Sequence, residues 1–116
     1  MTLFVSLILL ISTLPSWAQA IANPAAPRVE YVDSLPGNVY GYTTADGRIL
    51  LAPMCRANDE VLAQCLVHEG QHLRGHGECL AYTAQLLLAV KQSDDSWWFA
   101  YNLYEQFGKP VCLLEI

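Results

Sequence analysis

Residues 58–82 decide the fold, and they read NDEVLAQCLVHEGQHLRGHGECLAY. Asn58 or Asp59 can cap a helix, because a short polar side chain accepts a hydrogen bond from a free N–H of the first turn. Asp59 and the glutamate after it also place negative charge at the helix N-terminus, where the helix dipole favours it. Apolar residues follow at helical spacing until Gly75 and Gly77 interrupt them. The stretch predicts an amphipathic helix that starts near Asn58 and ends before Gly75.

Two more helices are expected after this one. Leucine and alanine at helical spacing predict the second from about residue 78 to residue 91. The third begins near Ser93 and carries a stripe of aromatic residues, namely Trp97, Trp98, Tyr101, Tyr104 and Phe107. Gly108 and Pro110 are expected to end it. Residues 111–116 would then form a final strand or a tail held by a disulfide.

The chain before the first helix has the composition of short strands. Residues 28–32, 39–44 and 48–52 are rich in β-branched and aromatic side chains, and Asp46-Gly47 is a hairpin turn signal. Strands that precede helices, rather than alternate with them, indicate an α+β fold. We expect a short antiparallel β-hairpin or sheet followed by the helices, in a single domain over residues 28–116.

Residues 1–20 have the features of a signal peptide. They carry no charged side chain, and their apolar run is shorter than the roughly 20 residues that span a bilayer. Ala18-Gln19-Ala20 matches the small-x-small pattern read by signal peptidase. We expect cleavage after Ala20, a secreted or periplasmic protein, and no stable membrane anchor after cleavage. An uncleaved anchor is the alternative, because no Lys or Arg precedes the run. Residues 21–27 are expected to be an extended lead-in.

The composition excludes two classes of protein. The chain has 116 residues, with 6 Lys and Arg against 11 Asp and Glu, which gives a formal net charge of −5. Nucleic-acid binding needs clustered basic residues, and this sequence has no such cluster, so no nucleic-acid partner is expected. A charged fraction of 15% and a hydrophobic fraction of 53% exclude a disordered tail protein.

The chemistry is indicated by His68-Glu69-Gly70-Gln71-His72, an H-E-x-x-H pattern inside the predicted helix. His68 and His72 lie one turn apart on one face, so both imidazoles can reach one metal ion. Glu69 leaves the helix in another direction and can approach a water on that metal without being a ligand. Zinc lowers the pKa of such a water to about 7, and the glutamate takes its proton. The pattern predicts a metallohydrolase with Glu69 as general base; the alternative is a polar helix face with incidental histidines.

A catalytic zinc site has three protein ligands and one open position. We favour Glu78 as the third ligand, because Gly75 and Gly77 let the chain reverse sharply and bring its carboxylate back to the ion. His76 is the other candidate; its ring would lie in the loop, where it can instead bind substrate or stabilise the transition state. An ordinary acidic residue at a helix N-terminus is the alternative interpretation of Glu78.

Two residues of the second helix are candidates for supporting roles. Tyr82 lies one turn after Glu78 on the same face, so its hydroxyl can reach the cleft and stabilise an oxyanion. Packing with a polar tip is the commoner role of such a tyrosine. Gln85 lies about a turn beyond Tyr82 and is a candidate for orienting a metal ligand.

All four cysteines, Cys55, Cys65, Cys79 and Cys112, follow the predicted signal peptide. An even number in an exported chain implies two disulfides, for which three pairings exist. We favour Cys55–Cys65 with Cys79–Cys112. Cys65 lies about 10 Å along the helix axis from His72, whereas Cys79 lies near the turn, so a direct bond between those two would be strained.

The pattern from His68 to His72, followed by Glu-Cys-Leu-Ala-Tyr at residues 78–82, resembles the gluzincin metallopeptidases. These zincins carry H-E-x-x-H on one helix and a glutamate ligand on the next, often with a small residue three places later. The resemblance covers roughly residues 39–90 and implies a minimal zincin-like domain. It also implies that the strand before the zinc helix, here Gly47 to Ala52, borders the substrate cleft. The loop before Glu78 is shorter than in typical gluzincins.

A second resemblance is to the metzincins, because residues 68–78 read H-E-x-x-H-x-x-G-x-x-E. Metzincins have His or Asp where Glu78 stands and a Met-turn further on, whereas Met54 precedes the motif here. Both resemblances imply a Zn²⁺ ion on His68, His72 and Glu78, with Glu69 as base. We therefore expect a zinc metallopeptidase acting on a peptide or protein substrate. The alternative, motivated by the small size, is a non-catalytic secreted binding module with a structural or vestigial zinc site.

Overall fold

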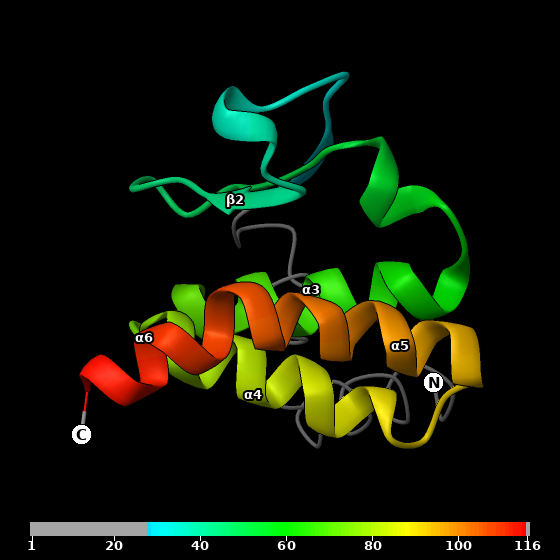
Figure 1. Ribbon diagram of the computed structural model, residues 1–116. Coiled ribbons are helices and arrows are strands. Elements are labelled where there is room, and N and C mark those ends of the chain that lie inside the picture. Colours follow the sequence, from blue (N-terminus) through cyan, green and yellow to red (C-terminus); the bar gives the residue numbers. More distant parts are fainter. Residues whose placement is uncertain (1–27, 116) are drawn as a thin grey trace, which may run out of the picture.

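The computed structural model describes residues 28–115, which form two layers (Figure 1). A three-stranded sheet makes up one layer, and helices make up the other, with α3 (Asp59–Leu73) next to the sheet. The predicted α+β fold is confirmed. The signal peptide, its cleavage point and the lead-in predicted over residues 1–27 lie outside the described residues.

The sheet is a hairpin with a third strand added in parallel. β2 (Gly41–Thr43) and β3 (Ile49–Leu51) pair antiparallel across the predicted turn, where Gly47 adopts the left-handed conformation at φ 86°. β1 (Val29–Tyr31) pairs in parallel with the other edge of β3. The expectation of an antiparallel sheet therefore holds for the hairpin and is wrong for β1.

The strand order β1-β3-β2 follows from burial. Ile49 and Leu51 of β3 are 1% and 0% exposed, so β3 takes the central position, where both of its edges are covered. The chain after β1 passes through the short 3₁₀ turn η1 (Pro36–Asn38) and reaches the far edge of the sheet before β2 begins. Crossing the sheet in this way leaves β1 parallel to β3.

Helix α3 forms as its sequence predicts. The side chain of Asn58 accepts a hydrogen bond from the backbone N–H of Val61 (2.9 Å) and caps the helix. The apolar face of α3 packs against β3 and against η2 (Pro53–Arg56), a 3₁₀ turn that precedes the helix. Buried side chains of these elements form the core, namely Ile49, Leu51, Cys55, Val61 and Cys65. This packing holds α3 against the sheet.

The second helix, α4 (Glu78–Ala89), begins at the predicted residue. The third, α5 (Asp94–Leu103), continues through a π-helical turn, η3 (Tyr104–Gly108), into α6 (Lys109–Leu114). Gly108 and Pro110 therefore do not end the helical segment, and a final strand at residues 111–116 is wrong for the described part of that range. Pro110 cannot supply the N–H of a continuous helix, and it lies two residues after the end of the π-helical turn, where the regular α-helical hydrogen-bond pattern is already interrupted. Gly108 is buried, and a Cβ there would lie 2.6 Å from Cβ of Tyr82.

Both disulfides have the favoured pairing. Cys55–Cys65 joins η2 to α3, and Cys79–Cys112 joins the start of α4 to α6. Two disulfides indicate an oxidising, extracellular compartment. Within residues 28–115, no helix is long and apolar enough to cross a membrane.

Candidate metal centre

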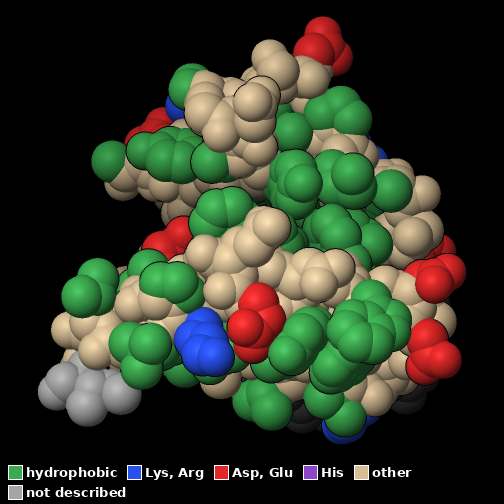
Figure 2. All heavy atoms as spheres, viewed as in Figure 1, with side chains coloured by type: hydrophobic (Ala, Val, Ile, Leu, Met, Phe, Trp, Pro, Cys, Tyr) green, Lys and Arg blue, Asp and Glu red, His purple; other side chains and the backbone are tan. Residues whose placement is uncertain are grey.

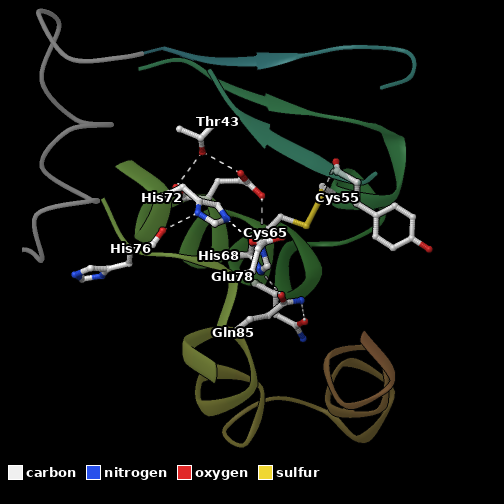
Figure 3. A network of polar contacts seen from close by, with 11 residues as sticks. Thr43, Cys55, Cys65, His68, His72, His76, Glu78 and Gln85 are labelled. Atoms are coloured by element: carbon white, nitrogen blue, oxygen red, sulfur yellow. Dashed lines mark hydrogen bonds and ion pairs between the residues drawn. A yellow bond between two sulfur atoms is a disulfide. The ribbon is translucent and has the colours of Figure 1, made fainter. Parts of the chain in front are cut away.

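Three donor atoms from α3 and α4 converge at the sheet side of the helical layer (Figure 3). Nε2 of His68 lies 3.0 Å from Oε1 of Glu78, and Nε2 of His72 contacts the same oxygen. Gly75, left-handed at φ 83°, turns the chain between the two helices, so that Glu78 faces the histidines from the first residue of α4. The structure thus brings together the three residues that the sequence selects as ligands.

The other ring nitrogens of both histidines are held by protein oxygens. Nδ1 of His68 lies 2.9 Å from Oε1 of Gln85, as expected of a residue that orients a metal ligand. Nδ1 of His72 donates to the backbone carbonyl of His76 (2.9 Å). Each ring is thereby fixed with Nε2 directed at Glu78.

This arrangement needs a positive charge between His72 and Glu78. A carbonyl oxygen only accepts hydrogen bonds, so Nδ1 of His72 carries a proton, and Nε2 of the neutral ring has only a lone pair. A lone pair facing a carboxylate oxygen is repulsive unless a proton or a metal ion is shared between them. In the metal-free protein, the hydrogen bond with Glu78 raises the pKa of His72 to about 9. Hydrogen bonds with His68 and His72 lower the pKa of Glu78 to about 2.

Glu69 lies beside this cluster and is held by the sheet. Its side chain is buried, and Oε2 lies 3.9 Å from Nε2 of His68. The hydroxyl of Thr43 on β2 lies 2.9 Å from Oε1 of Glu69, to which it donates, and 3.1 Å from the Glu69 carbonyl oxygen. Burial raises the pKa of the Glu69 carboxyl, while neighbouring His68 and the Thr43 hydrogen bond lower it. Gly41 permits the close approach of β2, because a Cβ there would lie 3.1 Å from Oε2 of Glu69.

Two carboxylates are therefore candidates for the third ligand. One donor atom from each of His68, Glu69 and His72 lies within 4.8 Å of the others. Glu78 is closer to both imidazoles through a single oxygen. Glu69 has one oxygen engaged by Thr43 and the other 3.9 Å from His68. The geometry favours Glu78 as ligand and Glu69 as a neighbouring base.

The ring of His76 does not join the cluster. Its Nδ1 lies 2.9 Å from Oε1 of Gln71, and Figure 3 shows the ring directed away from the other two imidazoles. The backbone carbonyl of His76 orients His72 instead. The candidacy of His76 as a ligand is therefore not supported by its position.

Tyr82 packs with its ring edge-on to His68, at 4.4 Å between ring centroids, and it stacks on Phe107. Burial raises the pKa of Tyr82 to about 12, so the phenol stays protonated at neutral pH. The residue lines the cleft beside the histidines. It is thus in the expected region, and its ring also provides packing for a candidate ligand.

A cleft of about 1030 Å³ opens over the cluster. Figure 2 shows a hollow between the sheet layer and the helical layer at the left of the view. Both walls are largely apolar, with Val39, Tyr40 and Tyr42 on the sheet side and Leu103, Phe107 and Val111 on the helical side. The expectation that residues 47–52 border the cleft is wrong, because none of them lines it, whereas residues 37–45, which include the edge strand β2, do.

Sequence reasoning missed two residues of the site. Thr43 reaches Glu69 from a strand 26 positions away in the sequence, and no local pattern indicates that contact. Gln64 is fully buried and lies one turn before His68 on α3, so helical spacing could have placed it on the face of the ligands. Comparison with protein-family models, curated proteins and solved structures yields no significant match.

Proposed function

We propose that this protein is a zinc-dependent metallopeptidase in which His68, His72 and Glu78 hold the metal and Glu69 is the general base. The observation that carries the proposal is the convergence of two imidazole Nε2 atoms and one carboxylate oxygen beside a second, buried carboxylate. Two imidazoles and a carboxylate are a donor set that suits zinc. A structural zinc site uses four protein ligands, whereas this proposal leaves one position for water and substrate.

A bound zinc ion would supply Lewis acidity, acidifying a water molecule and polarising the carbonyl of the substrate. Glu69 then accepts the proton of the attacking water at Oε2, since Thr43 occupies Oε1. The same carboxyl returns the proton to the nitrogen of the leaving amine. Burial suits Glu69 to this work, because a carboxyl with a raised pKa is a better base and a usable acid.

The cleft supports a peptide as the substrate. Among the described residues, β2 pairs only with β3, so its other edge is free to accept backbone hydrogen bonds from an extended segment. Leu103 and Phe107 line the same cleft and offer apolar surface for side chains of the peptide. We also propose export through the signal peptide at residues 1–20, which agrees with the two disulfides.

The test compares three single variants with the parent. Glu69→Gln keeps the size of the side chain and removes its basicity, so it should bind zinc like the parent and lose about 10²- to 10⁴-fold in peptide hydrolysis. Glu78→Gln should bind zinc more weakly. Glu105→Gln is the matched control, because Glu105 is an exposed glutamate that pairs with Lys109 outside the cleft, and it should change neither property.

Two results would overturn the proposal. Loss of zinc from Glu69→Gln would make Glu69 a ligand rather than a base. Tight zinc binding by the parent, without hydrolysis of any peptide in a mixed-sequence library, would favour the non-catalytic binding module.

A further inference from the structure

Two glutamines are buried beside the candidate metal centre, and each is in contact with the other. Gln64 on α3 is 0% exposed, and Gln85 on α4 is 3% exposed. Nε2 of Gln85 donates to Oε1 of Gln64 (3.1 Å), and Oε1 of Gln85 faces Nδ1 of His68 (2.9 Å). Two buried, hydrogen-bonded amides stabilise a fold little more than leucine or methionine would in the same places. Their hydrogen bonds therefore call for a role other than stability. Their place next to His68 suggests that role.

The direction of every hydrogen bond in this chain of residues is set at its far end. Nε2 of Gln64 donates to the backbone carbonyl of Ser96 (2.7 Å), which can only accept, so the amide nitrogen of Gln64 must point there. Its oxygen then faces Gln85, which must present its own nitrogen. The oxygen of Gln85 is left for His68, whose Nδ1 must therefore carry the proton.

A second carbonyl reinforces the same direction. Nε2 of Gln92 donates to the carbonyl of Glu60 (3.0 Å), so Gln92 turns its oxygen to Nε2 of Gln64 (2.8 Å). Loss of Gln92 would still leave the Ser96 carbonyl to orient Gln64. Gln92 is therefore a natural control for the role of Gln64.

We infer that Gln64 is a positioning residue for the metal centre: through Gln85 it keeps the proton of His68 on Nδ1 and leaves the Nε2 lone pair free for a metal ion. The inference rests on the metal site of the proposed function and concerns residues that touch neither metal nor substrate. Without Gln64, the amide of Gln85 loses the acceptor that sets its orientation. It can then turn its nitrogen to Nδ1, which places the His68 proton on Nε2, where it blocks metal binding.

The first experiment reads the proton position directly, by ¹⁵N NMR of the His68 ring in metal-free protein at alkaline pH. It uses a Glu78→Ala background, because the Glu78 carboxylate would otherwise favour a proton on Nε2. In that background the ring should be protonated at Nδ1. Adding Gln64→Met should populate the Nε2-protonated form, whereas adding Gln92→Met should not. An unchanged proton position with Gln64→Met would overturn the inference.

The second experiment measures Zn²⁺ affinity by chelator competition in the chain with Glu78 intact. Gln85→Met should weaken zinc binding by about 10- to 100-fold. Gln64→Met should weaken zinc binding by at least about 2-fold. An amide of Gln85 that is free to take either orientation leaves His68 ready to bind metal in only about half of the molecules. Gln92→Met should leave zinc binding unchanged. In a Gln85→Met background, Gln64→Met should have no further effect, because it acts only through Gln85.

The results separate a positioning role from a structural one. If Gln64→Met weakens zinc binding equally with and without Gln85, the side chain acts through folding or packing, and the inference is wrong. If the parent binds no zinc at all, the proposed function fails, while the NMR result still decides whether Gln64 sets the proton position of His68.

Discussion

Replacing Thr43 with valine tests how the sheet contributes to the candidate active site. Valine keeps the branched shape that suits β2 and removes the hydroxyl that donates to Oε1 of Glu69. A hydrogen bond to a charged group contributes about 1.5–3 kcal/mol. If that contribution orients the base, its loss corresponds to about 10- to 100-fold in kcat. Zinc content should not change, because Thr43 contacts none of the three proposed ligands.

The matched control is Thr44→Val. The hydroxyl of Thr44 accepts a hydrogen bond from the backbone N–H of Arg48 (2.8 Å) and contacts Asp46. This change therefore removes the hydrogen bonds of a neighbouring threonine hydroxyl that does not contact Glu69. The assay is peptide hydrolysis with zinc content measured on the same samples, together with urea unfolding of the metal-free protein. Thr43→Val should also lower the unfolding free energy by about 1–3 kcal/mol, because buried Glu69 loses a partner. Hydrolysis within twofold of the parent by zinc-loaded Thr43→Val would refute the reasoning.

Two further predictions concern stability. Replacing both Cys79 and Cys112 with alanine should lower the free energy of unfolding in urea by about 4 kcal/mol, because this disulfide spans 33 positions. Replacing both Cys55 and Cys65, which are 10 positions apart, should lower it by about 3 kcal/mol. The opposite order would contradict the loop-entropy argument. Hydroxyl donors on the α5 N-terminus lower the pKa of Glu60 below its ordinary 4.5, so its stabilising effect is present above pH 4.5 and is lost as the pH falls through the lowered value. The melting temperature of Glu60→Gln should therefore be lower than that of the parent at neutral pH, and the difference should shrink in acid. The same difference in melting temperature at all pH values would contradict this.

Features that depend on a few neighbouring residues were predictable from the sequence. The cap at Asn58, the start of α4 at Glu78 and the hairpin turn at Gly47 follow from residues within one turn of each. The approach of Glu78 to both histidines also follows from local geometry, because helical spacing and one left-handed glycine define it. Whether these three residues bind zinc stays a prediction.

Features that depend on sheet order or on packing between helices were not predictable in this way. The strand that lines the cleft is β2 because β3 is buried at the centre, which no residue of the hairpin indicates by itself. Gly108 and Pro110 are ordinary helix terminators. The chain remains helical because Gly108 packs closely on Tyr82 and Pro110 follows a π-helical turn that already interrupts the regular α-helical pattern. The parallel partner of β3 depends on how the loop after β1 crosses the sheet.

The structure also indicates how so small a domain could hold the candidate metal site in a defined geometry. The apolar core lies mainly between the sheet and the first half of α3, whereas the proposed ligands lie in the second half and at the start of α4. Small domains often supplement a small core with disulfides. Here the Cys79–Cys112 disulfide fixes the residue after Glu78 to α6, Gln85 holds His68, and Thr43 holds Glu69. Glu78, His68 and Glu69 are thus restrained by three different elements, namely α6, α4 and β2. The geometry of the site therefore does not depend on the apolar core alone.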